Sequence, residues 1–250
     1  MNENKKKIKL FLEGNIGTGK TTLGQKLVEK YKDSEFITEP VNDWINIKDN
    51  DDKQNILEKF YINKERWGYT FQTFAFLTKA KLISNPQEKS IRFLERSILT
   101  DKNVFAKALY ESGEMSNIEF KMYLEWSEWI YKEIEEKVGP HDGIIYIRCD
   151  PQISYNRVKV RSRTEENLIP IEYLEKIHKY HDDWLLNNNN DCLLNNNNVI
   201  VIDVNNDFEN NEKELEIIIN KISEFIDKIY EKNKIDSELN KNTNKNCSIN

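Results

Sequence analysis

A phosphate-loop motif near the start of the chain constrains the fold more than any other feature. Residues 14–21 read Gly-Asn-Ile-Gly-Thr-Gly-Lys-Thr, a full match to the pattern G-x-x-x-x-G-K-[ST]. The motif follows an apolar run at residues 8–13, which predicts a buried strand, and precedes residues 21–31, where apolar residues recur at helical spacing. Because strand and helix are both in place, the motif predicts a loop that binds nucleotide phosphates rather than a chance glycine-rich turn.

The residue types of this loop indicate how it would hold phosphates. Glycines let the backbone approach closely, so that its N–H groups can point at phosphate oxygens. Lys20 supplies a mobile positive charge for the β and γ phosphates, and Thr21 supplies a hydroxyl for Mg²⁺. The expected phosphate-binding residues are therefore Gly14, Asn15, Ile16, Gly17, Thr18, Gly19, Lys20, Thr21 and Thr22. The motif alone fits a GTPase, a motor, a nucleoside kinase or a nucleotide kinase equally well.

Predicted strands and helices alternate along the rest of the chain. Further strands are expected at residues 36–39, 91–94, 143–148 and 199–203. Helical patterns occupy residues 54–82, 101–111, 117–138 (with Asn117 as its cap), 151–165, 170–186 and about 211–230. The alternation predicts an α/β fold, a five-stranded parallel sheet with helices on both faces.

Two asparagine-rich segments stand apart from this pattern. Of the 32 asparagines, many lie in an imperfect repeat at residues 187–198, which we interpret as an insert that lengthens a surface loop. Residues 231–250 carry few apolar side chains and predict a disordered polar tail. No linker divides the chain, so residues 1–230 are expected to form one domain.

Composition excludes several other classes of protein. The net charge of −6 gives no global basic field for a nucleic-acid polymer. No apolar run approaches the roughly 20 residues of a membrane span, and the N-terminal residues resemble neither a secretory signal nor a transit peptide. Three cysteines without paired spacing and three histidines predict reduced thiols and no zinc site. A cytoplasmic location is the resulting expectation.

Outside the phosphate loop, several short blocks of residues follow one another in a distinctive order. They are Glu39-Pro40-Val41 with Trp44, Tyr61, Glu65-Arg66-Trp67 with Thr70–Thr73, Glu95-Arg96-Ser97 with Asp101, the basic residues Arg157, Arg161 and Arg163 with Glu165-Glu166, and Ile169–Leu174. Together these blocks resemble the deoxynucleoside kinase family, over most of residues 8–230. The resemblance implies a P-loop kinase fold with an arginine-rich lid, ATP and Mg²⁺ as co-substrate and cofactor, and a homodimer formed through long helices, for which residues 117–138 are a candidate.

The resemblance also implies roles for individual residues around the reacting groups. Glu39, at the end of the second predicted strand, would accept the proton of the 5′-hydroxyl, and Arg96 would orient Glu39 and the reacting oxygens. Glu95 would help hold Mg²⁺ through water. The lid would bring guanidinium groups of Arg157, Arg161 and Arg163 to the phosphates, and Glu166 with Tyr61 would bind the 3′-hydroxyl of the sugar.

The base would be recognised by a third set of residues. By resemblance, Gln72 reads the base through its amide, while Trp44 and Phe105 form apolar walls. Asp101 is present where family members that accept cytosine and purines pair it with an arginine, but Lys79 stands at the second position and lacks the planar fork of arginine. The pattern favours a purine deoxynucleoside, with deoxycytidine or broad specificity as the alternative.

Two other functions can be weighed against this one. A non-catalytic nucleotide-binding relative would be favoured by loss of Lys20, Glu39 or Arg96, and all three are present. A nucleoside monophosphate kinase would need a basic pocket for the acceptor phosphate, whereas Tyr61 and Gln72 suit hydroxyl and amide groups. The sequence therefore predicts ATP-dependent phosphorylation of the 5′-hydroxyl of a deoxynucleoside.

Overall fold

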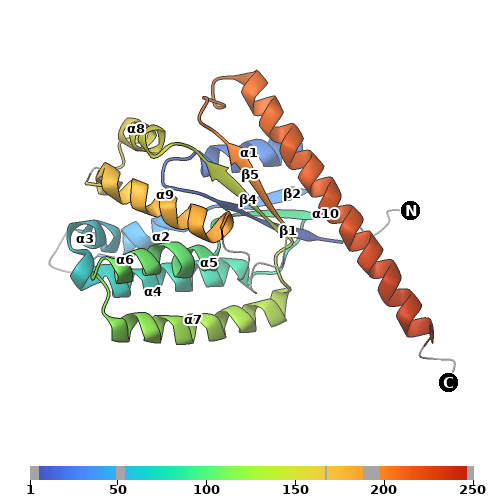
Figure 1. Ribbon diagram of the computed structural model, residues 1–250, viewed down its shortest axis with the longest axis horizontal. Coiled ribbons are helices and arrows are strands. Elements are labelled where there is room, and N and C mark those ends of the chain that lie inside the picture. Colours follow the sequence, from blue (N-terminus) through green and yellow to red (C-terminus); the bar gives the residue numbers. More distant parts are fainter. Residues whose placement is uncertain (1–5, 49–53, 167, 188–197, 247–250) are drawn as a thin grey trace.

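The computed structural model describes residues 6–48, 54–166, 168–187 and 198–246. Its centre is a five-stranded sheet in the order β2-β3-β1-β4-β5, and every paired neighbour is parallel (Figure 1). The strands are β1 (Ile8–Glu13), β2 (Ser34–Ile37), β3 (Ile91–Glu95), β4 (Gly143–Arg148) and β5 (Val199–Asp203). The predicted parallel sheet is thus confirmed.

Helices cover both faces of the sheet, as the alternating pattern predicted. One face packs on α1 (Lys20–Lys30) and α10 (Glu212–Asn246). The other packs on a larger group, namely α2 (Val41–Asn46), α3 (Ile56–Ile62), α4 (Lys64–Ile83), α5 (Ile98–Thr100), η1 (Asp101–Ala106), α6 (Lys107–Glu111), α7 (Asn117–Val138) and α9 (Ile171–Leu185). The segments α8 (Pro151–Arg161) and η2 (Thr164–Glu166) follow β4 near its carboxyl end.

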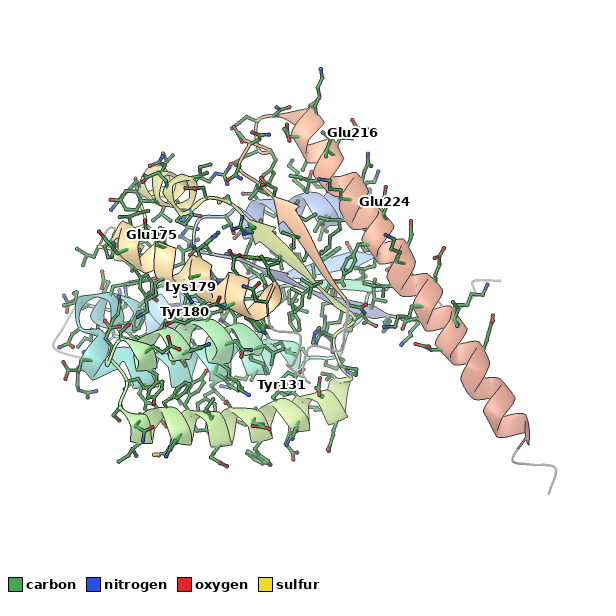
Figure 2. The ribbon with its side chains drawn as sticks, in the orientation of Figure 1. Tyr131, Glu175, Lys179, Tyr180, Glu216 and Glu224 are labelled. Carbon is green, nitrogen blue, oxygen red and sulfur yellow. The ribbon has the colours of Figure 1, made fainter. Side chains whose placement is uncertain are left out.

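The period-two geometry of the strands sorts their side chains between two cores. All six residues of β1 are buried. Leu10 and Leu12 point into the core beneath α1 and α10, whereas Phe11 points into the core beneath α4 and α9. Figure 2 shows the same sidedness on α10, where Glu216 and Glu224 lie on the outer face, away from the sheet.

Local chemistry moves several element boundaries away from the predicted positions. The second strand ends at Ile37 rather than at residue 39, so Glu39 lies in the connection to α2. Helix α7 is capped by Ser116 rather than by Asn117, because Ser116 forms a reciprocal capping box with Glu119. Helix α8 ends at Arg161 instead of continuing to residue 165, because Ser162 takes a left-handed conformation with φ of 52°.

The C-terminal segment differs most from its prediction. Where a disordered tail was expected from residue 231, α10 continues as a helix to Asn246 and projects past the sheet (Figure 1). Ile222, Ile226 and Ile229 anchor it on the core, and beyond them a helix without proline or glycine can extend, since each added residue gains one backbone hydrogen bond. The predicted insert lies almost entirely outside the described residues. Of the helices described, none combines the length and apolarity that a membrane span requires.

Candidate active site

A cavity of about 240 Å³ opens at the carboxyl ends of β1, β2 and β3. This is the edge at which open parallel sheets bind ligands, because the connecting loops diverge there. Residues far apart in the sequence line it, drawn from the phosphate loop, the β2–α2 connection, α3, α4, the end of β3, η1 and the segment around η2. The cavity therefore joins most of the residues that the sequence singled out.

The phosphate loop forms one end of the cavity through Ile16, Gly17, Lys20 and Thr21. At Gly17, φ is 82°, and a Cβ atom would lie 2.6 Å from the carbonyl oxygen of Ser154, so only glycine fits this turn. Lys20 begins α1 and donates to the carbonyl oxygens of Gly14, at 3.1 Å, and Asn15, at 2.6 Å. The other predicted loop residues, Gly14, Asn15, Thr18, Gly19 and Thr22, complete the loop without lining the cavity.

The ammonium group of Lys20 is held in a state that favours loss of its proton. Burial, followed by the positive charge of Arg96, lowers the pKa of Lys20 to about 7. The carbonyl oxygens that it contacts carry no full charge. A phosphate placed at the loop would supply the missing negative charge.

Thr21 and Glu95 place oxygen atoms side by side next to the loop. The Thr21 hydroxyl lies 2.9 Å from each carboxylate oxygen of Glu95. Both side chains line the cavity. A hydroxyl and a carboxylate are the hard oxygen ligands that Mg²⁺ prefers, and so this pair fits a hydrated magnesium ion.

Glu39 lies at the centre of the cavity among three cations. Arg96 Nη1 lies 2.5 Å from Glu39 Oε2, and Lys79 Nζ lies 3.2 Å from Oε1. Burial would raise the pKa of Glu39, but Arg96, Lys79 and Lys20 outweigh it and hold the pKa at about 2. Glu39 is therefore a carboxylate at neutral pH, ready to accept a hydrogen bond or a proton.

Away from the phosphate loop, two buried hydrogen-bond acceptors beside the cavity lack a donor. Lys79 Nζ also lies 2.7 Å from Asp101 Oδ1, so the lysine bridges Glu39 and Asp101. Burial raises the pKa of Asp101 to about 6, against the opposing effect of Lys79. Asp101 Oδ2 and Gln72 Oε1 are buried and have no hydrogen-bond partner among the described residues. Orphaned buried polar atoms that border a cavity mark the groups a ligand would satisfy.

Aromatic and aliphatic side chains form the walls. Trp44 is buried and donates from Nε1 to the Thr78 hydroxyl at 2.9 Å, and Phe105 faces Lys79 and Arg96. Trp67 packs against the core and does not line the cavity. Sequence reasoning missed part of the wall, namely Leu57, Phe60, Phe71 and Tyr173. The signal was available for Leu57 and Phe60, which are three residues apart on one helical face beside Tyr61.

The basic cluster divides between two locations. Arg161 and Arg163 line the cavity, where Arg161 pairs with Glu166 Oε2 and Arg163 Nη1 lies 3.5 Å from Glu166 Oε1. Tyr61 lines the same region, and burial raises its pKa. Arg157 lies elsewhere, donating to the carbonyl oxygens of Val204 and Asn206 after β5. The structure thus brings together two of the three arginines predicted for the phosphates.

Comparison with known proteins adds an independent line of support. A family model described as deoxynucleoside kinase matches residues 10–227. That range contains β2 to β5, all of β1 except its first two residues, and every residue that lines the cavity.

Individual relatives match over much of their length. Deoxycytidine kinase 2 of Gallus gallus is 35% identical over 240 residues, which cover 87% of this chain and 90% of that protein. Thymidine kinase 2, mitochondrial, of Homo sapiens is 39% identical over 184 residues, covering 74% and 66% respectively. Deoxyguanosine kinase, mitochondrial, of Xenopus laevis is 32% identical over 237 residues, covering 87% and 89%. The names of these relatives specify three different deoxynucleosides, so the similarity leaves the base open.

Proposed function

The chain belongs to the deoxynucleoside kinase family of phosphotransferases, and from this premise we propose that residues 1–230 act as one domain that transfers the γ-phosphoryl group of ATP to the 5′-hydroxyl of a purine deoxynucleoside. The observation that carries the proposal is the single cavity that holds Lys20 of the phosphate loop, the Glu39 carboxylate and the orphaned acceptors of Gln72 and Asp101. A group suited to the phosphates of ATP, a carboxylate suited to accept a proton, and groups suited to a nucleoside therefore border the same cavity.

In the proposed reaction, side chains of the cavity neutralise the charge of the phosphates and orient the carboxylate that accepts the proton. Lys20 and the lid residues Arg161 and Arg163 meet the negative charge spread over the γ-phosphoryl oxygens. Glu39 is ionised at neutral pH and accepts the proton of the 5′-hydroxyl as the new bond to phosphorus forms. Arg96, already 2.5 Å from Glu39, fixes the direction of its carboxylate.

The proposed reaction includes a Mg²⁺ ion beside the phosphate loop, at the Thr21 hydroxyl and the Glu95 carboxylate. Thr21 and Glu95 would hold the ion, the glutamate through water. When bound, Mg²⁺ would neutralise part of the negative charge on the β and γ phosphates. Because only two side chains contribute, the phosphates and water would complete the coordination.

The sugar and the base would occupy the remainder of the cavity. Glu166, Tyr61, Trp44 and Phe105 all line the cavity, where the first two would bind the 3′-hydroxyl and the last two would flank the base. Asp101 Oδ2 accepts hydrogen bonds and therefore suits a base edge that presents an N–H or amino group. Adenine, guanine and cytosine each carry an amino group, whereas thymine offers only a ring N–H. The deoxycytidine kinases among the relatives support deoxycytidine as the second candidate.

The proposal is tested by assaying radiolabelled phosphate transfer from ATP to each of the four natural deoxynucleosides. We expect deoxyadenosine or deoxyguanosine to give the highest kcat/KM and thymidine the lowest. The Glu39→Gln variant, assayed alongside, should lose about 10²–10³-fold in kcat, as removal of one preorganised charged group does. Absence of transfer to every deoxynucleoside, or near-normal turnover by Glu39→Gln, would refute the proposed reaction.

We further propose that the enzyme is a homodimer that pairs through α7. Three apolar side chains on this helix are strongly exposed, Ile118 at 71%, Met122 at 54% and Trp129 at 62%. Their spacing of four and then seven residues places them on one stripe. A second copy of the same helix would bury the stripe in a symmetric contact.

The cytoplasmic location predicted from the thiols also stays a proposal. Cys149 is free and buried, which suits a reducing compartment. Two kinds of relative are named as mitochondrial, and so imaging of the tagged chain in its own cells is the deciding experiment.

A further inference from the structure

A buried carboxyl group lies just outside the cavity and takes no part in the reaction described above. Glu13 is the last residue of β1 and is 0% exposed, and it does not line the cavity. Burial raises the pKa of its carboxyl, and hydrogen bonds from Ser97 and Thr100 oppose that effect. A buried acid is unfavourable unless it is well bonded, and so its partners indicate what it does.

Glu13 continues a ladder of hydrogen bonds past the end of the sheet. The Arg96 N–H donates to the Leu12 carbonyl at 3.0 Å, and the next N–H, that of Ser97, donates to Glu13 Oε1 at 2.8 Å. The Thr100 hydroxyl donates to Glu13 Oε2 at 2.5 Å. Two consecutive residues of β1 thus hold two consecutive N–H groups of the turn that follows β3.

This turn has an unusual backbone conformation. Arg96 has φ of 61°, one of two non-glycine residues with positive φ in the described part of the chain. Left-handed conformations of residues with a Cβ atom are strained and persist only where the surroundings enforce them. The Leu12 and Glu13 contacts on either side of Arg96 are such an enforcement.

The direction of the Arg96 side chain depends on that conformation. The guanidinium leaves the turn toward Glu39 Oε2, at 2.5 Å, and the Gly14 carbonyl, at 3.3 Å. The preceding residue, Glu95, meets the Thr21 hydroxyl at 2.9 Å. If the turn relaxed to an ordinary conformation, both side chains would leave these partners.

We propose that Glu13 is a positioning residue for phosphoryl transfer, its carboxyl group locking the Arg96–Ser97 turn so that Arg96 and Glu95 face the reacting groups. The inference rests on the proposed function, because it assigns Glu13 a part in that reaction. It predicts an effect on turnover rather than on substrate binding, since the side-chain hydrogen bonds of Glu13 go to Ser97 and Thr100, and neither of these lines the cavity. A misplacement of about 1 Å in a catalytic group can cost on the order of 100-fold in rate.

The test uses variants that differ in which hydrogen bonds they keep. Thr100→Val removes one donor at nearly constant volume, and Glu13→Leu removes both acceptors. Glu13→Gln keeps both contacts, because its carbonyl can accept from Ser97 and its amide can donate to the Thr100 hydroxyl. Thr73→Val is the matched control, since Thr73 donates to the Tyr69 carbonyl at 2.8 Å within α4 and does not line the cavity.

We expect Thr100→Val to lower kcat at least about tenfold, with both KM values within about threefold, at temperatures where melting curves show it folded. Glu13→Leu should lose more, Glu13→Gln should recover most of that loss, and Thr73→Val should match the parent. In an Arg96→Met background, Thr100→Val should have a smaller effect than in the parent, because one of the two side chains through which it acts is gone.

The outcomes separate the inference from the proposed function. An active parent with unchanged kcat in folded Thr100→Val, or an equal loss with and without Arg96, overturns the role of Glu13 alone. A parent that phosphorylates no deoxynucleoside overturns the proposed function and this inference with it. If Glu13→Leu does not fold, the Thr100→Val result decides.

Discussion

At the scale of single residues, the cavity places one carboxylate among three cations. Glu39 faces Arg96 and Lys79 directly, and Lys20 contributes to holding its pKa at about 2. Burial, followed by the positive charge of Arg96, lowers the pKa of Lys20 to about 7. A polyanion such as ATP, placed at the phosphate loop, would favour the charged form of Lys20.

The lowered pKa of Lys20 leads to a prediction about pH. Phosphates need the charged form of Lys20, and the free enzyme loses that form as the pH rises through about 7. We expect kcat/KM for ATP to fall toward tenfold per pH unit above that point, whereas kcat at saturating ATP stays flat, because bound phosphates restore the higher pKa. The measurement is a pair of pH profiles from pH 6 to 9. A flat kcat/KM profile would contradict it.

The base end of the cavity carries a prediction about substrate choice. Thymine places a methyl group where Asp101 and Lys79 would crowd it, and it would leave a buried charged group poorly satisfied. That penalty exceeds the roughly 1–3 kcal/mol of a neutral group. Replacing both partners together, as Asp101→Ala with Lys79→Met, should raise the kcat/KM of thymidine relative to deoxyadenosine by at least about tenfold. Kinetics of parent and double variant measure it, and an unmoved ratio would show that this pair does not read the base.

The sequence identified the residues with chemistry better than those that shape the cavity. Glu39, Arg96 and Lys79 converge as expected, because motifs at strand ends share one edge of a parallel sheet. Arg157 was grouped with Arg161 by its four-residue spacing, yet it bonds to the Val204 carbonyl. Helical spacing shows which residues share a face and not where that face points. Tertiary packing brings the segment after β5 next to Arg157, and helical spacing does not predict that contact.

At the scale of elements, strands were predicted more accurately than helix ends. The continuous apolar runs of β1 and β4 leave little choice, since both faces of a central parallel strand are buried. Helix ends depend on one or two capping contacts, such as the Ser116–Glu119 box. The continuation of α10 to Asn246 depends on a helix already anchored by its N-terminal half, which local composition does not reveal.

The asparagine-rich insert offers a prediction at this scale. Residues 187–198 contain only Leu193 and Leu194 as apolar anchors beyond the repeat of asparagines. The entropic cost of closing a loop grows slowly with its length, and each doubling of the length adds only about 0.6 kcal/mol. Replacing the insert by a short turn should therefore leave kcat within about twofold and the melting temperature nearly unchanged. A large loss of activity or of soluble protein would show that the insert packs against the domain.

At the scale of the whole molecule, two features of the described surface contrast with each other, namely the cavity at the carboxyl ends of the strands and the apolar stripe on α7. Described residues of one chain line the cavity, and many of them are polar or charged. The stripe of Ile118, Met122 and Trp129 has the opposite character, because α7 buries its inner face against α4 and still exposes large apolar side chains. Exposed apolar stripes of this kind mark interfaces more often than free surface.

The last prediction follows from that stripe. A symmetric dimer would bury Met122 and Trp129 at its centre, and two carboxylates introduced there would be desolvated without partners. Met122→Glu with Trp129→Glu should therefore convert a dimeric parent into a folded monomer, with an unchanged circular dichroism spectrum, in sedimentation runs at micromolar concentration. The matched control is Glu224→Lys, a charge change on the outer face of α10 (Figure 2), which should leave the dimer intact. A monomeric parent, or a double variant that stays dimeric, would place the interface elsewhere or remove it. The comparison thus tests the stripe itself rather than the general tolerance of the surface to charge.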